Sequence, residues 1–161
     1  MTRQHSPWLN DREQRAWRGL VRLQAELFGR LNRHIARETE LSAPDYEVLV
    51  NLSEAPEGRL RVFELGAAMR WEKSRLSHHL RRMADRGLIA KVSCPSDARG
   101  AFVEITDAGR RAIEVAAPTH VAEVRRLFVD ALSEEQLDQL AAIADAVVNT
   151  LDPEESCDEP A

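Results

Sequence analysis

Cysteine is scarce in this chain of 161 residues, which contains only Cys94 and Cys157. The two fit no metal-binding spacing and offer no disulfide framework, so we expect no metal site and a reducing compartment. No apolar run approaches the roughly 20 residues that span a membrane. The first residues also lack the apolar stretch of a signal peptide. These absences predict a cytoplasmic protein that carries no cofactor.

Catalytic motifs are missing as well. The sequence contains no nucleophile motif, no paired-histidine zinc motif and no glycine-rich phosphate loop. Four histidines remain as a source of acid–base chemistry in an enzyme alternative: His34, His78, His79 and His120. The adjacent His78 and His79 point about 100° apart on a helix, so they make a poor metal pair. We therefore predict no catalytic residues.

Positive charge is scarce outside the middle of the chain. Residues 1–58 contain 8 basic and 9 acidic side chains, and residues 112–161 contain 2 basic and 12 acidic ones. Residues 59–111, in contrast, contain 12 basic and 6 acidic side chains. The formal net charge of −5 hides this basic segment. Such an asymmetry is typical of a local surface that binds a polyanion.

The apolar spacing is mostly helical. Apolar residues recur at three- and four-residue steps between residues 11 and 40, which predicts one long amphipathic helix. A helix of this length favours packing on a second subunit. We also expect helices over residues 42–55, 62–69, 72–86, 107–131 (with a kink at Pro118) and 133–151, and strands over residues 88–92 and 101–105. A short extended piece is expected near Leu60 and Arg61, directly before the helix over residues 62–69.

The segment WEKSRLSHHLRRMADRGLI carries five Arg and Lys residues, and on a helix it has two distinct faces. The apolar face contains Leu76, Leu80 and Met83, and the opposite face contains Ser74, His78, Arg81 and Asp85, flanked by Arg75 and Arg82. Charge runs on helices are usually only solvated surface. Here the charge is nearly all positive, and the helix is the second of a tight helix-turn-helix. We therefore favour insertion into the DNA major groove.

The residues that follow predict a wing. The strands expected at residues 88–92 and 101–105 enclose a loop rich in Pro, Ser, Asp and Gly, which is typical of a β-hairpin. Arg99, near the tip of that loop, can enter a narrow and electronegative minor groove. The alternative is that Asp97 and Arg99 are ordinary turn residues.

Three stretches resemble the MarR family of winged-helix transcriptional regulators: LSAPDYEVLVNL, LGAAMRWEKSRLSHHLRRMADRGLI and DARGAFVEITDAG. The resemblance implies an obligate dimer whose first and last two helices interlock. It also implies a pseudo-palindromic operator and, commonly, a small ligand that weakens DNA binding. By matching position it implies DNA contacts from Ser74, Arg75, Ser77, His78 and Arg81, and a wing contact from Arg99 that Asp97 holds in place.

Two residues depart from the family pattern. Arg70 stands where the turn usually has glycine, so we expect a positive φ at a cost of about 1 kcal/mol. A phosphate contact can recover that cost. His79 occupies a usually aliphatic position and is expected to be a half-buried structural histidine, with pH or metal sensing as the alternative. Arg70, Lys73 and Arg82 complete the predicted DNA-contacting set.

The expected fold is mainly α with a small β-hairpin wing. Residues 1–40 form an N-terminal dimerisation helix, residues 41–106 a winged helix-turn-helix domain, and residues 107–151 the C-terminal dimerisation helices. The acidic residues 152–161 have little to bury and are expected to be disordered.

The predicted function is a homodimeric, sequence-specific repressor that a small aromatic or acidic ligand releases from its DNA operator. Trp17, His34 and Arg37 on the first helix are the candidate ligand contacts, although each is also compatible with a core or surface role. A protein-interaction module without ligand sensing and a redox sensor acting through Cys94 are the alternatives. A lowered thiol pKa at Cys94 has little support, since its nearest basic neighbour is Lys91.

Overall fold

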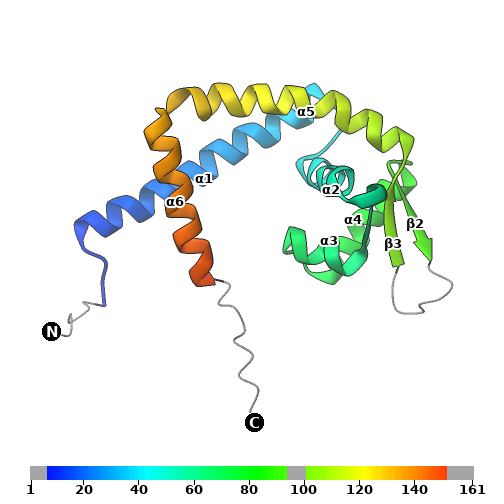
Figure 1. The fold of residues 1–161 in the computed structure, drawn as a ribbon, viewed down its shortest axis with the longest axis horizontal. Helices are drawn as coiled ribbons and strands as arrows, with labels where there is room; N and C mark the ends of the chain where they lie inside the picture. The colour runs from blue at the N-terminus through cyan, green and yellow to red at the C-terminus, as the bar shows by residue number, and fades with distance from the viewer. Residues whose placement is uncertain (1–6, 94–100, 152–161) are drawn as a thin grey trace, which may run out of the picture. The chain divides into compact units, whose positions relative to one another are not determined.

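The computed structural model describes residues 7–93 and 101–151. It forms two compact units, residues 1–123 and 124–161, which are treated separately below. The helices are α1 (Asp11–Glu38), α2 (Ala43–Glu54), α3 (Val62–Met69), α4 (Lys73–Asp85), α5 (Asp107–Leu127) and α6 (Glu134–Leu151) (Figure 1). The strands are β1 (Arg59–Arg61), β2 (Ile89–Ser93) and β3 (Ala101–Ile105), and short 3₁₀ turns cover Pro56–Gly58 and Val129–Ala131.

Helix starts follow local capping signals. The Ser42 hydroxyl accepts from the Asp45 backbone N–H at 3.2 Å, and the Asp45 carboxylate accepts from the Ser42 N–H at 2.9 Å. Thr106 caps α5 by accepting from the Gly109 N–H at 3.1 Å. Ser133 and Gln136 form the equivalent reciprocal pair before α6. These starts confirm the predicted ones, because capping depends only on residues within one helical turn.

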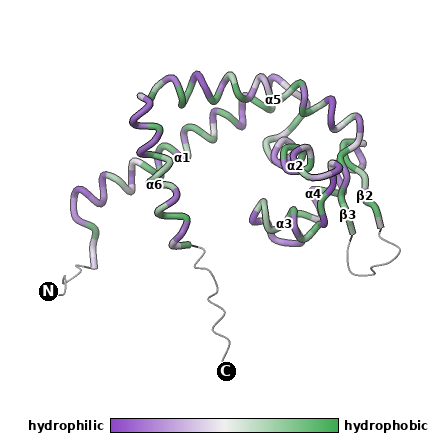
Figure 2. The backbone as a smooth tube through the Cα atoms, in the orientation of Figure 1, coloured by the Kyte–Doolittle hydropathy of each residue, from purple (hydrophilic) through white to green (hydrophobic). Residues whose placement is uncertain are grey.

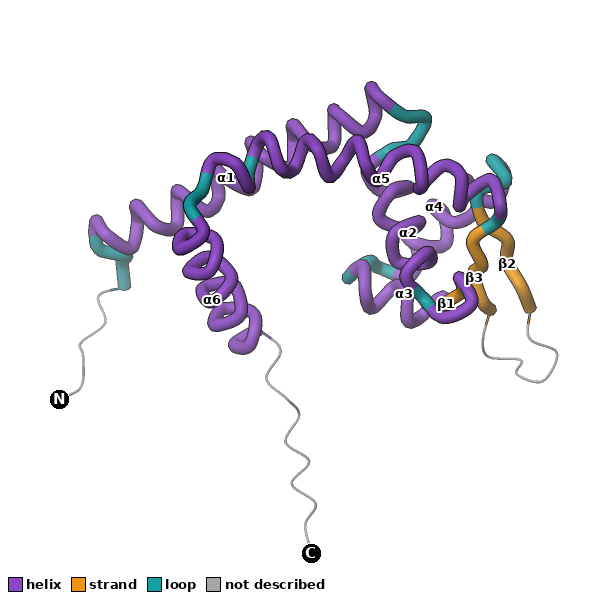
Figure 3. Tube along the Cα trace, turned by 45° about the horizontal axis from the view of Figure 1, so that its top comes forward, coloured by secondary structure: helices purple, strands orange, loops and turns teal. Residues whose placement is uncertain are grey.

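The sheet differs from the two strands predicted. Strands β2 and β3 form the expected antiparallel hairpin, with Ile89 opposite Ile105. A third strand, β1, pairs with the other edge of β3, which gives the order β1-β3-β2 (Figure 3). Three residues are too few to show an alternating pattern, so only the approach of β3 identifies β1 as a strand.

An aliphatic core holds α2, α3, α4 and the sheet together. Its members from α2 and α3 include Val48, Leu49, Leu52 and Leu65, all 0% exposed, and Leu76, Leu80, Met83 and Val103 complete its centre. Gly109 lies where α5 passes close to the start of the hairpin. A Cβ there would collide with the Leu88 carbonyl oxygen, so this position requires glycine.

Helices α1 and α6 leave apolar side chains uncovered within their own units. On α1 these include Trp17, Leu20 and Phe28, each more than half exposed, and on α6 they include Ile143 and Leu151. Figure 2 shows hydrophobic and hydrophilic segments alternating along both helices. Within the described residues, no helix is long and apolar enough to cross a membrane. α5 ends at Leu127, four residues before the predicted end, and the chain continues as a 3₁₀ turn.

Candidate nucleic-acid interface

The turn between α3 and α4 is tight and contains a residue in the left-handed region. Arg70 has φ 51° and ψ 40°, as predicted for a non-glycine residue at this position. Its backbone N–H donates to the Ala67 carbonyl at 3.1 Å, and the next N–H, of Trp71, donates to the Gly66 carbonyl at 3.0 Å. These bonds end α3 sharply and allow α4 to begin at Lys73.

Helix α4 has the two faces that its sequence predicts. Leu76, Leu80 and Met83 are at most 1% exposed and anchor the helix in the core. The opposite face carries exposed side chains, and Ser77 at its margin is half-buried; the exposed candidates are Arg70 in the turn and Lys73, Ser74, Arg75, His78, Arg81 and Arg82 on the helix.

Helix α4 carries four exposed cations whose ion pairs decide how much positive charge it presents. Among the residues that the structure describes, no carboxylate forms an ion pair with Lys73, Arg75, Arg81 or Arg82. Their charge therefore faces solvent on one side of the helix. Such a face suits a polyanion and offers both phosphate-binding and base-reading side chains.

Arg75 is held by an aromatic ring although it is exposed. Its guanidinium carbon lies 4.0 Å from the centroid of the Trp71 ring, which is a cation–π contact. The half-buried Trp71 packs against the core. The rings of Trp71 and His79 form a T-shaped contact, in which the ring centroids are 5.4 Å apart and the ring planes meet at 79°.

His79 is more deeply placed than the half-buried histidine expected from the sequence. It is 7% exposed, and its Nε2 lies 3.0 Å from Oδ1 of Asp45. Burial lowers the pKa of His79 below its ordinary value; Asp45 partly opposes this, whereas the positive charges of Arg82 and Arg75 add to it. The two atoms are within ion-pair distance, but their geometry does not meet that of a hydrogen bond.

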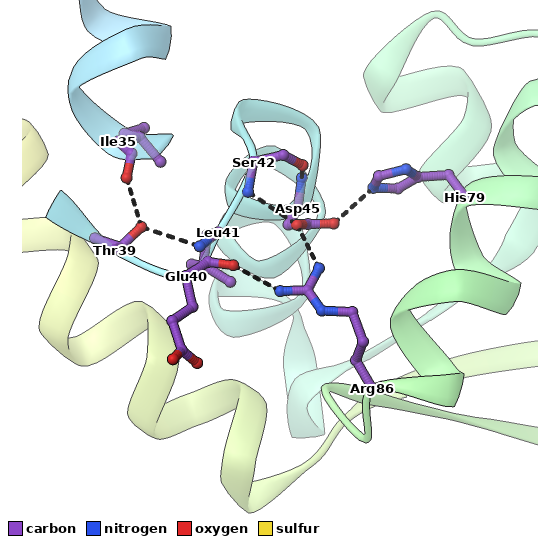
Figure 4. A network of polar contacts seen from close by, with 8 residues as sticks. All are labelled: Ile35, Thr39, Glu40, Leu41, Ser42, Asp45, His79 and Arg86. Carbon is purple, nitrogen blue, oxygen red and sulfur yellow. Dashed lines mark hydrogen bonds and ion pairs between the residues drawn. The ribbon is translucent and has the colours of Figure 1, made fainter. Parts of the chain in front are cut away.

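Asp45 is the centre of this polar network (Figure 4). Its carboxylate is 1% exposed, and its second oxygen accepts from Nη1 of Arg86 at 2.7 Å as well as from the Ser42 N–H. Arg86 also donates through Nη2 to the Glu40 carbonyl at 2.7 Å. Burial alone raises the pKa of Asp45, but the bonds from Arg86 and Ser42 outweigh it and hold that pKa below its ordinary value. The network joins both ends of the α1–α2 connection to α4.

Two solved structures from Streptomyces coelicolor resemble this chain over nearly its whole length. AbsC, a MarR family transcriptional regulator, is 38% identical with a TM-score of 0.86, covering 91% of this chain and 98% of AbsC. Sco3205, a MarR family transcriptional regulator solved in complex with DNA, is 35% identical with a TM-score of 0.88, covering 96% and 97%. A MarR family model matches residues 33–100. The chain belongs to the MarR family.

Members of the MarR family are winged-helix, DNA-binding transcription regulators, so the predicted family and fold class are confirmed. A more distant structure, CouR from Rhodococcus jostii RHA1 bound to p-coumaroyl-CoA, has the same fold. It is 24% identical with a TM-score of 0.68, covering 80% of this chain and 87% of CouR. No match was found among curated proteins.

The tip of the MarR-like wing lies outside the described residues. Asp97, Arg99 and Cys94 are there, and the expectations for them stay predictions. The same holds for Cys157 and the acidic residues 152–161.

The base of the wing carries two cations that the sequence did not point to. The guanidinium carbons of Arg59 and Arg61, on β1, lie 5.5 and 4.8 Å from the Phe102 ring centroid on β3. Only the pairing of β1 with β3 brings them beside the wing, and their local spacing contains no signal of this.

The three candidate ligand residues of α1 do not form one site. Trp17 is 59% exposed and lies 17 residues before His34, which on a helix is about 25 Å. Arg37 is exposed and pairs with the neighbouring Glu38 at 2.9 Å. Within one subunit, therefore, one small ligand cannot contact both Trp17 and His34.

His34 instead belongs to a polar cluster that sequence inspection missed. The rings of Tyr46 and His120 lie 4.7 Å apart, tilted by 49°. His34 Nε2 and His120 Nδ1 are buried and have no hydrogen-bond partner within the described residues. Burial lowers the pKa of His120, and the charge of His34 adds to that effect. The three residues come from α1, α2 and α5, so their separation along the chain hides the cluster.

A cavity of about 680 Å³ lies elsewhere, between α3, the start of α4 and the base of the wing. Phe63, Arg70, Trp71, Lys73, Ser77 and Lys91 are among its lining residues. It therefore adjoins the predicted DNA-contacting residues, and none of the candidate ligand contacts Trp17, His34 and Arg37 lines it.

Proposed function

We propose that this chain is a homodimeric repressor that places two copies of α4 in successive major grooves of a pseudo-palindromic operator and leaves it when a small ligand binds. The cationic face of α4, whose lysine and arginines form no ion pair with a carboxylate among the described residues, is the observation that carries the proposal. Phosphate contacts by Lys73, Arg70 and Arg82 orient the helix, and Ser74, Arg75, Ser77, His78 and Arg81 meet base edges. Arg99, held by Asp97, is assigned to the minor groove.

The uncovered apolar faces of α1 and α6 support the dimer. Exposed apolar area costs roughly 25 cal/mol per Å² relative to burial. Side chains as large as Trp17, Phe28 and Ile143, each more than half exposed, therefore favour association with a second copy. A two-fold axis also matches the symmetry of a palindromic operator.

The cluster of His34, Tyr46 and His120 is our proposed ligand contact. Two buried ring nitrogens that have no hydrogen-bond partner among the described residues each cost about 1–3 kcal/mol until a polar group reaches them. A carboxylic acid with an aromatic body supplies such a group and stacks on Tyr46. CouR, which has this fold, was solved bound to p-coumaroyl-CoA, so one protein of this fold binds a small-molecule ligand. The ligand acts only through different affinities for the DNA-bound and free shapes.

Duplex selection tests DNA binding. The intact protein is used to select duplexes from a random pool, and the selected duplex is titrated between about 50 and 200 mM salt. We expect an inverted repeat and a steep loss of affinity with salt. Ser74→Ala and His78→Ala should each reduce discrimination by about 1–3 kcal/mol. Arg82→Ala should weaken all duplexes alike and lower the salt slope by about one. A dimer that selects no duplex would instead favour the protein-interaction alternative.

A further inference from the structure

The long side chain of Arg75 must lose conformational freedom before it can contact a base. An arginine side chain carries about 2 kcal/mol of rotamer entropy. The 4.0 Å contact with the Trp71 ring already restricts the Arg75 guanidinium in the DNA-free protein. A guanidinium stacked on an aromatic face keeps its N–H donors in the plane of the stack, where they remain available to a base edge.

The orientation of the Trp71 ring is in turn determined by the turn backbone and by a buried residue of α4. Its backbone is held by the turn, and its ring forms a T-shaped contact with the ring of His79, which lies one helical turn after Arg75 on α4. His79 is buried, so its ring cannot itself reach DNA. The ring has little freedom to rotate, because its Nε2 lies 3.0 Å from the Asp45 carboxylate.

The carboxylate that orients His79 is itself immobilised. Arg86 and the Ser42 N–H hold the second oxygen of Asp45, at 2.7 and 2.9 Å. A continuous series of contacts therefore runs from the buried Asp45 through His79 and Trp71 to the exposed Arg75. Each member of this series lies on or against α4, and only its last member faces solvent fully.

We propose that Trp71 and His79, oriented by Asp45, are positioning residues that pre-set Arg75 for base recognition. The inference rests on the proposed DNA binding. The buried His79 and the half-buried Trp71 thereby increase the discrimination between operator and random DNA. Their effect on DNA is transmitted by Arg75 and disappears when Arg75 is absent.

A double-mutant cycle tests this dependence. The probe is the duplex that the intact protein selects, and the readout is the ratio of its affinity to that of a random duplex. Trp71→Leu should reduce the ratio roughly threefold to fivefold, the size of an exposed cation–π contact. In an Arg75→Ala background, Trp71→Leu should cause no further reduction. The matched control is Arg81→Ala, an exposed arginine of the same helix, in which Trp71→Leu should keep its full effect.

Two further variants separate positioning from folding. Trp71→Phe keeps an aromatic face and should restore most of the discrimination lost in Trp71→Leu. His79→Gln keeps a donor toward Asp45 but loses the ring edge, so it should reduce discrimination by about twofold, again only when Arg75 is present. Unfolding curves identify any variant that has lost its fold, and if Trp71→Leu is one of them the cycle is completed with His79→Gln.

The outcomes are distinct. If Trp71→Leu reduces discrimination equally in the Arg75→Ala and Arg81→Ala backgrounds, or if both Trp71 and His79 variants leave it unchanged, the positioning role is overturned while the proposed function stands. If the intact protein selects no duplex, the proposed function fails and takes this inference with it.

Discussion

Residues 43–105 bury apolar side chains that are about as large as those which helices α1 and α6 leave exposed. In the helices and strands between residues 43 and 105, Leu49 and Val103 are 0% exposed, whereas Phe28 on α1 and Ile143 on α6 are 56% and 60% exposed. The side chains are equally apolar. Short connections let α2, α3, α4 and the sheet fold onto one another, but α1 and α6 extend as long single helices. The first region holds most of the buried core, and the second leaves large apolar side chains that the proposed dimer would cover.

The largest expected effect comes from charging the α6 face. Ile143→Glu combined with Val147→Glu places two carboxylates one turn apart on the uncovered side. Burying them in a dimer costs several kcal/mol per ion, so the dimer dissociation constant should rise by about a hundredfold or more. Sedimentation as a function of concentration measures this. Asp145→Lys, a charge change elsewhere on the exposed α6, serves as the control. An unchanged dimer in the double variant would show that α6 is not at the interface.

A smaller effect distinguishes a covered from an uncovered side chain inside one unit. Leu49→Ala should lower the free energy of unfolding by about 3 kcal/mol, because it leaves a cavity in the core. Phe63→Ala removes a larger side chain that is 67% exposed on α3, and should cost less than about 1 kcal/mol. Urea unfolding measures both. Equal losses would mean that Phe63 is covered in solution.

The next effect in size is on the stability of the fold at acid pH. The folded pKa of His79 lies below the unfolded value of about 6.5, so the unfolded chain binds this proton first as pH falls. Stability is therefore complete above about pH 6.5 and decreases below it. His120 contributes in the same direction. Asp45, with its lowered pKa, adds a further loss only below about pH 4.

His79→Gln should therefore flatten the loss of melting temperature between about pH 7.5 and 5.5 without removing it. The same substitution at His78, exposed on the same helix, should leave the dependence unchanged. Thermal unfolding at several pH values decides between them. A pH dependence that survives intact in His79→Gln would place the responsible proton on another group.

The smallest expected effect is at the turn. Arg70→Gly relieves the positive φ and should stabilise the chain by about 0.5 kcal/mol after the entropy cost of glycine. It should also weaken duplex binding a few-fold and lower the salt slope by about one, because a phosphate contact is lost. Calorimetry and duplex titration measure the two effects. Tighter binding by the glycine variant would exclude the phosphate role.

Much of the fold was predictable because its signals are local. Ser42, Thr106 and Ser133 cap the helices that they were expected to start, and α3 has the predicted bounds Val62–Met69. The cationic and apolar faces of α4 follow from its period of 3.6 residues. The extended backbone of β1 was predicted near Leu60 and Arg61, but its pairing with β3 was not, since that pairing joins residues far apart in the chain.

The sequence by itself therefore determined the helices and the two faces of α4, which depend on residues a few positions apart, and its resemblance to the MarR family implied the positive φ at Arg70. Only the tertiary structure decided that His79 faces Asp45, that Arg86 bonds to that same carboxylate 41 residues away, and that His34 and His120 each bury a ring nitrogen with no hydrogen-bond partner among the described residues. The physical reason is that capping and periodicity act within a helical turn, whereas a buried polar contact exists only once the packing of separate helices has removed water from both groups.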